Sequence, residues 1–83
     1  MRKVPFTVEN IKVGTIFRAT GKDYLITKVN EDNPYMVELL NVSMNEKYRG
    51  TVYPLYIFDP SFFRNPNMSL WIKDPLLSIE EML

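Results

Sequence analysis

The residues of this 83-residue chain that are best suited to chemistry are basic and aromatic side chains interleaved along its first half. Arginine and lysine pair with phosphates and tyrosine rings stack on bases, which is how small barrels hold single-stranded nucleic acid. The plainer interpretation puts the rings in the core and the cations along its rim. Ten basic residues balance ten acidic ones, so no net charge attracts the chain to nucleic acid. The candidate nucleic-acid site consists of Arg18, Lys28, Arg49, Tyr24 and Tyr48.

A second group of rings lies in the second half of the chain. The sequence holds five Tyr, five Phe and one Trp, a high share for a chain of this length. Either these rings form a second layer of the core, or those that the core cannot hide mark an interface, where aromatic residues are enriched. We favour the interface. The candidate protein-binding residues are Tyr53, Tyr56, Phe58, Phe62, Phe63 and Trp71.

Catalytic and metal-binding patterns are scarce. The chain has no Cys and no His, which removes thiolate chemistry, zinc–sulfur sites and the commonest general base. The acidic pairs Glu31-Asp32 and Glu80-Glu81 are predicted to lie on a turn and on a helix face, where carboxylates are normally solvated. Its serines have no His to activate them, and its glycines lie too far apart to form a phosphate-binding loop. We therefore expect no enzyme, no cofactor and no metal.

The elements that must position these residues begin with a four-stranded meander over residues 13–53. Runs of alternating or β-branched residues are separated by turn residues, which favours antiparallel strands. Gly21 suits a tight hairpin, Gly50 suits a bulge or sharp bend, and Pro54 is expected to interrupt the ladder. Within the second strand, Tyr24, Ile26 and Lys28 are expected on one face. The predicted strands are 15–19, 23–30, 35–43 and 48–53.

Further elements are predicted on either side of the meander, all within one domain of residues 1–83. Thr7 could cap a short N-terminal helical turn over residues 7–11. Residues 54–73 form an aromatic-rich extension that ends in a last strand at 69–73. Asp74-Pro75 is a typical helix start, so residues 74–83 are predicted to be a short helix. Its apolar stripe of Leu76, Ile79 and Leu83 should cover the open end of the sheet or contact a second chain.

The meander resembles a known group of small folds. The segments that carry the resemblance are 11–17 (IKVGTIF), 24–29 (YLITKV), 37–42 (VELLNV) and Val52. They are similar to small SH3-like barrels, especially short phage proteins of unassigned function, and the similarity covers about half of the chain. It implies an SH3-like barrel or a strongly bent sheet. Such families share no catalytic residues, so the resemblance assigns no role to any residue here.

Together these observations predict a mainly β protein that binds another protein without catalysing a reaction. The resemblance adds the expectation of a phage-encoded modulator or inhibitor of a host protein. The bound protein could also be a second copy of the chain, which would form a homodimer. Single-stranded nucleic-acid binding is the alternative. Arg2 and Lys3 are not followed by an apolar segment, and no stretch is apolar enough to span a bilayer, so we expect a cytoplasmic protein with no membrane contact.

Overall fold

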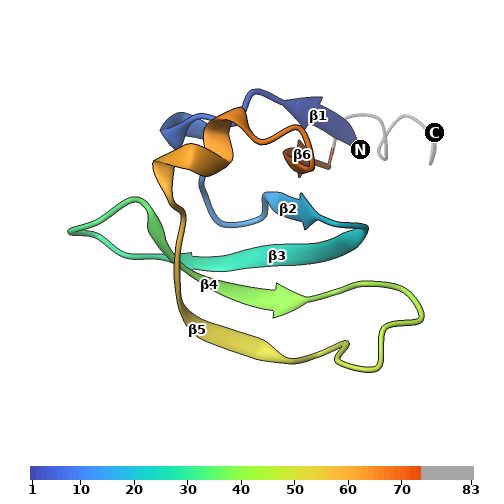
Figure 1. Ribbon diagram of the computed structural model, residues 1–83. Helices are drawn as coiled ribbons and strands as arrows, with labels where there is room; N and C mark the ends of the chain where they lie inside the picture. Colours follow the sequence, from blue (N-terminus) through green and yellow to red (C-terminus); the bar gives the residue numbers. More distant parts are fainter. Residues whose placement is uncertain (74–83) are drawn as a thin grey trace, which may run out of the picture.

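The computed structural model describes residues 1–73, which form one antiparallel β-sheet and two short 3-10 helices (Figure 1). This confirms the predicted mainly β class. Among these residues there is no α-helix, and the helix predicted at 74–83 lies outside the described residues. The strands are β1 (Arg2–Val4), β2 (Ile16–Ala19), β3 (Lys22–Val29), β4 (Met36–Asn41), β5 (Val52–Ile57) and β6 (Met68–Ile72), in the spatial order β1-β6-β2-β3-β4-β5.

The predicted meander is confirmed, because β2, β3, β4 and β5 lie side by side in chain order. Its first hairpin turns through Thr20 and Gly21, both at positive φ (51° and 79°), as two-residue hairpin turns require. Gly50 forms the predicted bulge at a φ of 90°: its N–H donates to Asn41 O at 2.8 Å, and Asn41 N–H donates to Thr51 O at 2.9 Å, so Gly50 and Thr51 together oppose Asn41.

The prediction for the fourth strand was wrong. Strand β5 covers Val52–Ile57 instead of 48–53, and Pro54 lies inside it. A proline is tolerated there for two reasons: β5 is an edge strand of the described sheet, and its register against β4 shifts at this point, so that Pro54 and Leu55 together oppose Glu38. No regular ladder hydrogen bond therefore depends on the missing N–H.

The two ends of the described chain join the sheet beside the meander. The last strand, predicted at 69–73, is found as β6 and pairs with both β2 and β1. The predicted N-terminal turn is the 3-10 helix η1 (Val8–Asn10), although the hydroxyl of Thr7 accepts from Asn10 Nδ2 at 3.3 Å instead of capping the backbone. A second 3-10 helix, η2 (Pro60–Arg64), lies within the predicted aromatic-rich extension, where the sequence analysis placed no helix.

The sheet is open but strongly bent. In a flat sheet, β2 and β5 would be about 14 Å apart, since three steps of about 4.8 Å separate them. Yet the ring centroids of Phe17 on β2 and Tyr56 on β5 are 5.9 Å apart, so the inner faces of the two strands curl toward each other. Within the described residues the edge strands β1 and β5 do not pair with each other, so the sheet is not closed. Of the two predicted forms, a barrel or a strongly bent sheet, the described residues form the bent sheet.

The core lies on the inner, concave face of this sheet. Strand β4 alternates along its length, with the buried residues Val37, Leu39 and Asn41 pointing inward. The register shift at Thr27 in β3 changes the expected phase: Tyr24 and Ile26 face inward but Lys28 pairs with Glu38 on the outer face. The buried apolar core consists of Ile11, Phe17, Ile26, Val37, Leu39, Phe58 and Leu70.

Candidate functional site

Two tyrosines of β5 lie on the same face of the sheet because of a bulge. Tyr53 and Tyr56 are three residues apart, and in a regular strand they would point to opposite faces. Their partners on β4 are Leu39 and Val37, which both face inward. The extra residue at Pro54-Leu55 thus brings Tyr56 onto the inner face beside Tyr53.

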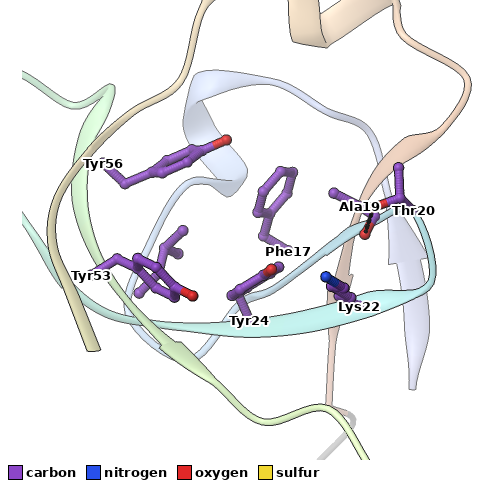
Figure 2. A pocket seen from close by; sticks show the side chains of 8 residues that line it. Phe17, Ala19, Thr20, Lys22, Tyr24, Tyr53 and Tyr56 are labelled. Carbon is purple, nitrogen blue, oxygen red and sulfur yellow. Dashed lines mark hydrogen bonds between the residues drawn. The ribbon is translucent and has the colours of Figure 1, made fainter. Parts of the chain in front are cut away.

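These two rings form one wall of a hollow of about 210 Å³ at the open end of the bent sheet, which we call the tyrosine hollow. Figure 2 shows Tyr53 and Tyr56 entering from one side, the β2–β3 hairpin with Lys22 from the other, and Phe17 and Tyr24 between them. The residues that line it are Phe17, Ala19, Thr20, Lys22, Tyr24, Leu39, Tyr53 and Tyr56.

The four rings of the hollow contact one another in a continuous array. The centroid of Tyr24 lies 5.9 Å from that of Tyr53 at a steep interplanar angle of 73°. It lies 6.0 Å from that of Phe17, whose other side contacts Tyr56 at 5.9 Å. Phe17 and Leu39 are almost fully buried and form the floor, whereas Tyr53 is 36% exposed at the rim. The array is anchored in the core at its centre and open to solvent at Tyr53.

Among residues 1–73 the tyrosine hydroxyls of the hollow have no side-chain hydrogen bond to one another or to the other lining residues. Among the lining residues Figure 2 draws one hydrogen bond, from Thr20 Oγ1 to Ala19 O at 2.7 Å, and it involves none of the three hydroxyls. Burial, followed by the proximity of Tyr53, raises the pKa of Tyr24 above its usual value, and burial also raises the pKa of Tyr56. Both phenols therefore stay neutral at physiological pH and can donate a hydrogen bond.

Lys22 gives the rim of the hollow a positive charge. It is the one charged residue among those that line the hollow within the described chain. Its Nζ lies 3.9 Å from Glu46 Oε2, a long and partly exposed ion pair that contributes little to stability. The ammonium group can therefore turn toward a negatively charged ligand at small cost.

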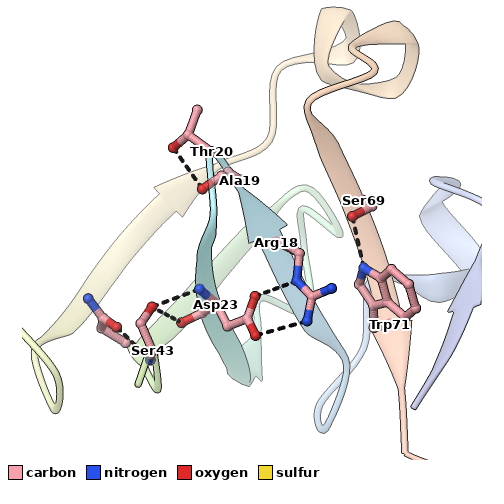
Figure 3. A network of polar contacts seen from close by, with 8 residues as sticks. Arg18, Ala19, Thr20, Asp23, Ser43, Ser69 and Trp71 are labelled. Atoms are coloured by element: carbon pink, nitrogen blue, oxygen red, sulfur yellow. Dashed lines mark hydrogen bonds and ion pairs between the residues drawn. The ribbon is translucent and has the colours of Figure 1, made fainter. Parts of the chain in front are cut away.

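The five residues predicted to bind nucleic acid do not lie on one face. Tyr24 is in the hollow, Arg18 and Lys28 are on the outer face, and Tyr48 and Arg49 are in the exposed β4–β5 connection. Figure 3 shows Arg18 held between two side chains of the outer face. Its Nε and Nη2 donate to the carboxylate of Asp23 at 2.7 and 3.1 Å, and its guanidinium lies 4.7 Å from the ring centroid of Trp71.

The six rings predicted to bind a protein are also divided. Phe58 is 1% exposed and belongs to the core, and the half-buried Phe62 and Phe63 pack against it. Trp71 is on the outer face, where its Nε1 donates to Ser69 Oγ at 2.8 Å. Tyr53 and Tyr56 are the two that the structure brings together, in the tyrosine hollow.

The serine and acidic residues considered for catalysis or metal binding form no such site among the described residues. Ser43 is buried, and its hydroxyl accepts from Asp23 N at 2.8 Å and donates to Asp23 O at 3.2 Å, which extends the pairing of β3 beyond β4 (Figure 3). Glu31 and Asp32 are exposed in a turn, and Glu80-Glu81 lies outside the described residues. Across residues 1–73 no three acidic side chains converge as metal ligands would, and no helix there is long and apolar enough to cross a bilayer.

No protein-family model, no curated protein and no solved structure matches this chain. Its function must therefore be inferred from the geometry described above.

The sequence analysis did not identify Phe17, Lys22 and Leu39 as part of a site. Phe17 and Leu39 were read as strand residues, and Lys22 as part of a loop, because their convergence depends on the bend of the sheet. One local signal was available: a proline between two tyrosines in an apolar run (Tyr53-Pro54-Leu55-Tyr56) is typical of an edge strand with a bulge.

Proposed function

We propose that this chain is a non-enzymatic protein-binding module and that a partner protein docks along β5. The observation that carries the proposal is the exposure of this edge strand. Val52, Leu55 and Ile57 are 50%, 76% and 57% exposed, and Tyr53 adds part of its ring at the rim of the hollow. Val52 and Ile57 pair with the outward-facing Leu40 and Met36, so the exposed apolar side chains lie on the outer side of this edge and the ring-lined hollow on its inner side. A partner that embraces the edge would contact both, and together they have the composition of an interface centre.

The comparison with the opposite edge supports this assignment. Strand β1 has three residues, of which Arg2 and Lys3 are charged and exposed, and short charged edges resist pairing with other chains. Strand β5 has six residues and no charge. Pro54 and the bulge at Pro54-Leu55 protect it from further strand pairing, but they leave the side chains of the strand accessible to a partner.

Several partners fit this proposal. A second copy of the chain could use the same strand, and the resemblance to phage proteins suggests a host protein that the module modulates or inhibits. A relation to SH3-like barrels is part of the same proposal and rests on that resemblance. Single-stranded nucleic acid is less well supported, because Arg18, Lys28 and Arg49 are separated and Arg18 is already paired with Asp23.

The test compares two exposed apolar residues of equal accessibility. Leu55 on β5 and Met44 in the β4–β5 connection are both 76% exposed. We expect Leu55→Asp to abolish capture of the partner from a nuclease-treated bacterial lysate, or to abolish self-association of the pure protein, because a charge would be buried in the interface. Met44→Asp should leave both unchanged, and both variants should retain the wild-type melting temperature.

The proposal is contradicted if Leu55→Asp and Met44→Asp behave alike in capture and in light-scattering measurements of molecular mass. Binding of an oligonucleotide at low salt that disappears as salt rises would instead favour the nucleic-acid alternative, since each neutralised phosphate releases a counterion.

A further inference from the structure

We propose that the tyrosine hollow receives one aromatic side chain of the partner, and that a carboxylate beside that ring pairs with Lys22. The inference rests on the proposed function, because it names the group that a partner docked along β5 would insert. The hollow lies directly beside β5, since Tyr53 and Tyr56 of that strand form its wall.

The size of the hollow favours a single side chain. At about 210 Å³ it is smaller than the pockets of roughly 300 to 1,000 Å³ that enclose whole small-molecule ligands. Partner proteins commonly anchor an interface by placing one large side chain in such a pocket, and Trp and Tyr are frequent anchors.

The composition of the walls favours a ring over an aliphatic group. Four of the eight lining residues are aromatic, and they surround the space from the floor at Phe17 to the rim at Tyr53. An inserted ring could meet them edge to face, as Tyr24 meets Tyr53, or tilted, as Phe17 meets Tyr56. A leucine or proline side chain would fill the same space without these ring contacts.

The charge of the rim favours an anion over a cation. Four rings could bind a quaternary ammonium group through cation–π contacts, but Lys22, the charged residue of the lining, would repel it, although Glu46 at 3.9 Å from Lys22 Nζ offsets part of this repulsion. A carboxylate is attracted by Lys22, and the neutral hydroxyls of Tyr24 and Tyr56 can donate hydrogen bonds to its oxygens or to a neighbouring carbonyl.

The test uses small probes that separate ring from charge. Binding to the full chain is followed by two-dimensional NMR with N-acetylphenylalanine, its neutral amide, N-acetylleucine, N-acetylproline and phenyltrimethylammonium. We expect N-acetylphenylalanine to bind with Kd of about 1 mM, as its number of heavy atoms allows. The amide and N-acetylleucine should bind at least threefold more weakly, and the cation should not bind measurably. The shifted signals should belong to the hollow, whereas the indole of Trp71 on the outer face should not shift.

Two lysine variants provide the control. Lys22→Gln should remove the preference for the carboxylate over the amide, whereas Lys28→Gln on the outer face should keep it. Both lysines are exposed, so neither variant is expected to impair folding.

The inference is overturned if N-acetylleucine, N-acetylproline or the cation binds as tightly as N-acetylphenylalanine, or if Lys22→Gln and Lys28→Gln have equal preferences. Its failure is distinct from failure of the proposed function. If Leu55→Asp abolishes partner capture while no ring binds the hollow, docking along β5 stands and the anchor does not. If the probes bind as expected and Leu55→Asp has no effect on capture, the hollow is a site and β5 is not the interface.

Discussion

At the scale of single residues, the side-chain hydroxyl of Thr15 is buried among the described residues without a hydrogen-bond partner there. Thr15 is 1% exposed. An unsatisfied buried hydroxyl costs about 1 to 3 kcal/mol. Thr15→Val keeps the branched shape and removes that cost, so we expect it to raise Tm by roughly 4 to 8 °C per kcal/mol gained.

Thr27 offers a matched comparison, measured by the same thermal denaturation. Its hydroxyl contacts Glu38 Oε1 at 2.8 Å and Glu38 O at 3.2 Å in the bulge of β3. Thr27→Val should therefore lower Tm. If Thr15→Val lowers Tm as well, the hydroxyl of Thr15 has a partner after all.

The tyrosines of the hollow give the protein a predictable response to alkaline pH. Burial raises the pKa of Tyr24 and Tyr56 in the folded chain, whereas a tyrosine in the unfolded chain titrates near about 10. Above that pH the unfolded state loses protons before the native state does, so the free energy of unfolding falls as pH rises. The stabilisation is complete below the unfolded pKa and is lost as pH passes through the folded pKa. Denaturant titrations between pH 8 and about 11 should give a flatter profile for Tyr24→Phe/Tyr56→Phe than for the wild type.

At the scale of elements, Pro54 prevents β5 from pairing with further strands. It lies where β5 departs from the register of β4, opposite Glu38, and it cannot donate a backbone hydrogen bond to an added strand. We expect Pro54→Val to increase self-association, measured by sedimentation velocity, because the variant has an uninterrupted apolar edge. Pro54→Lys restores the same N–H but adds a charge, and it should associate no more than the wild type. Equal behaviour of all three chains would contradict this role of Pro54.

The elements also explain which sequence patterns were read correctly. Thr20-Gly21 and Gly50 were predictable because turns at positive φ need particular residues whatever lies around them. An aspartate followed by a proline was taken as a helix start at Asp74-Pro75 but not at Asp59-Pro60, which was included in the aromatic-rich extension of residues 54–73. In the structure Asp59 begins η2, and its carboxylate accepts from Ser61 N at 2.8 Å. The rule that Asp followed by Pro begins a helix therefore also holds at Asp59-Pro60, where the sequence analysis did not apply it.

At the scale of the whole molecule, the predicted role of residues 74–83, which follow β6, can be tested by deletion. Leu76, Ile79 and Leu83 are apolar positions at helical spacing in the sequence. If they cover the protein's own core, deleting residues 75–83 should lower the free energy of unfolding by several kcal/mol, at about 1.5 to 3 kcal/mol for each buried side chain. If they contact another chain, the truncated protein should keep its stability in chemical denaturation and lose association. A truncated chain that is unchanged in both would exclude both roles.

The sequence by itself determined the class of the fold and the order of the meander. Alternation and turn residues are local properties, and neighbouring strands joined by short turns pair without help from distant parts of the chain. It also pointed to Tyr53 and Tyr56 as candidate binding residues. The turn that feeds β2 and the strand β6 were located within a residue or two for the same local reason.

Tertiary structure decided the rest. The pairing of β6 with β1 and β2 joins residues 49 to 70 positions apart, and no local pattern states which strands will meet at that distance. Both register shifts opposite Glu38 reverse the faces of the residues beyond them, so one bulge moved Lys28 outward and the other brought Tyr56 inward. The bend of the sheet then placed Phe17 within contact of Tyr56. The tyrosine hollow depends on two of these features, the bulge at Pro54-Leu55 and the bend of the sheet, because they bring Tyr56 inward and close to Phe17.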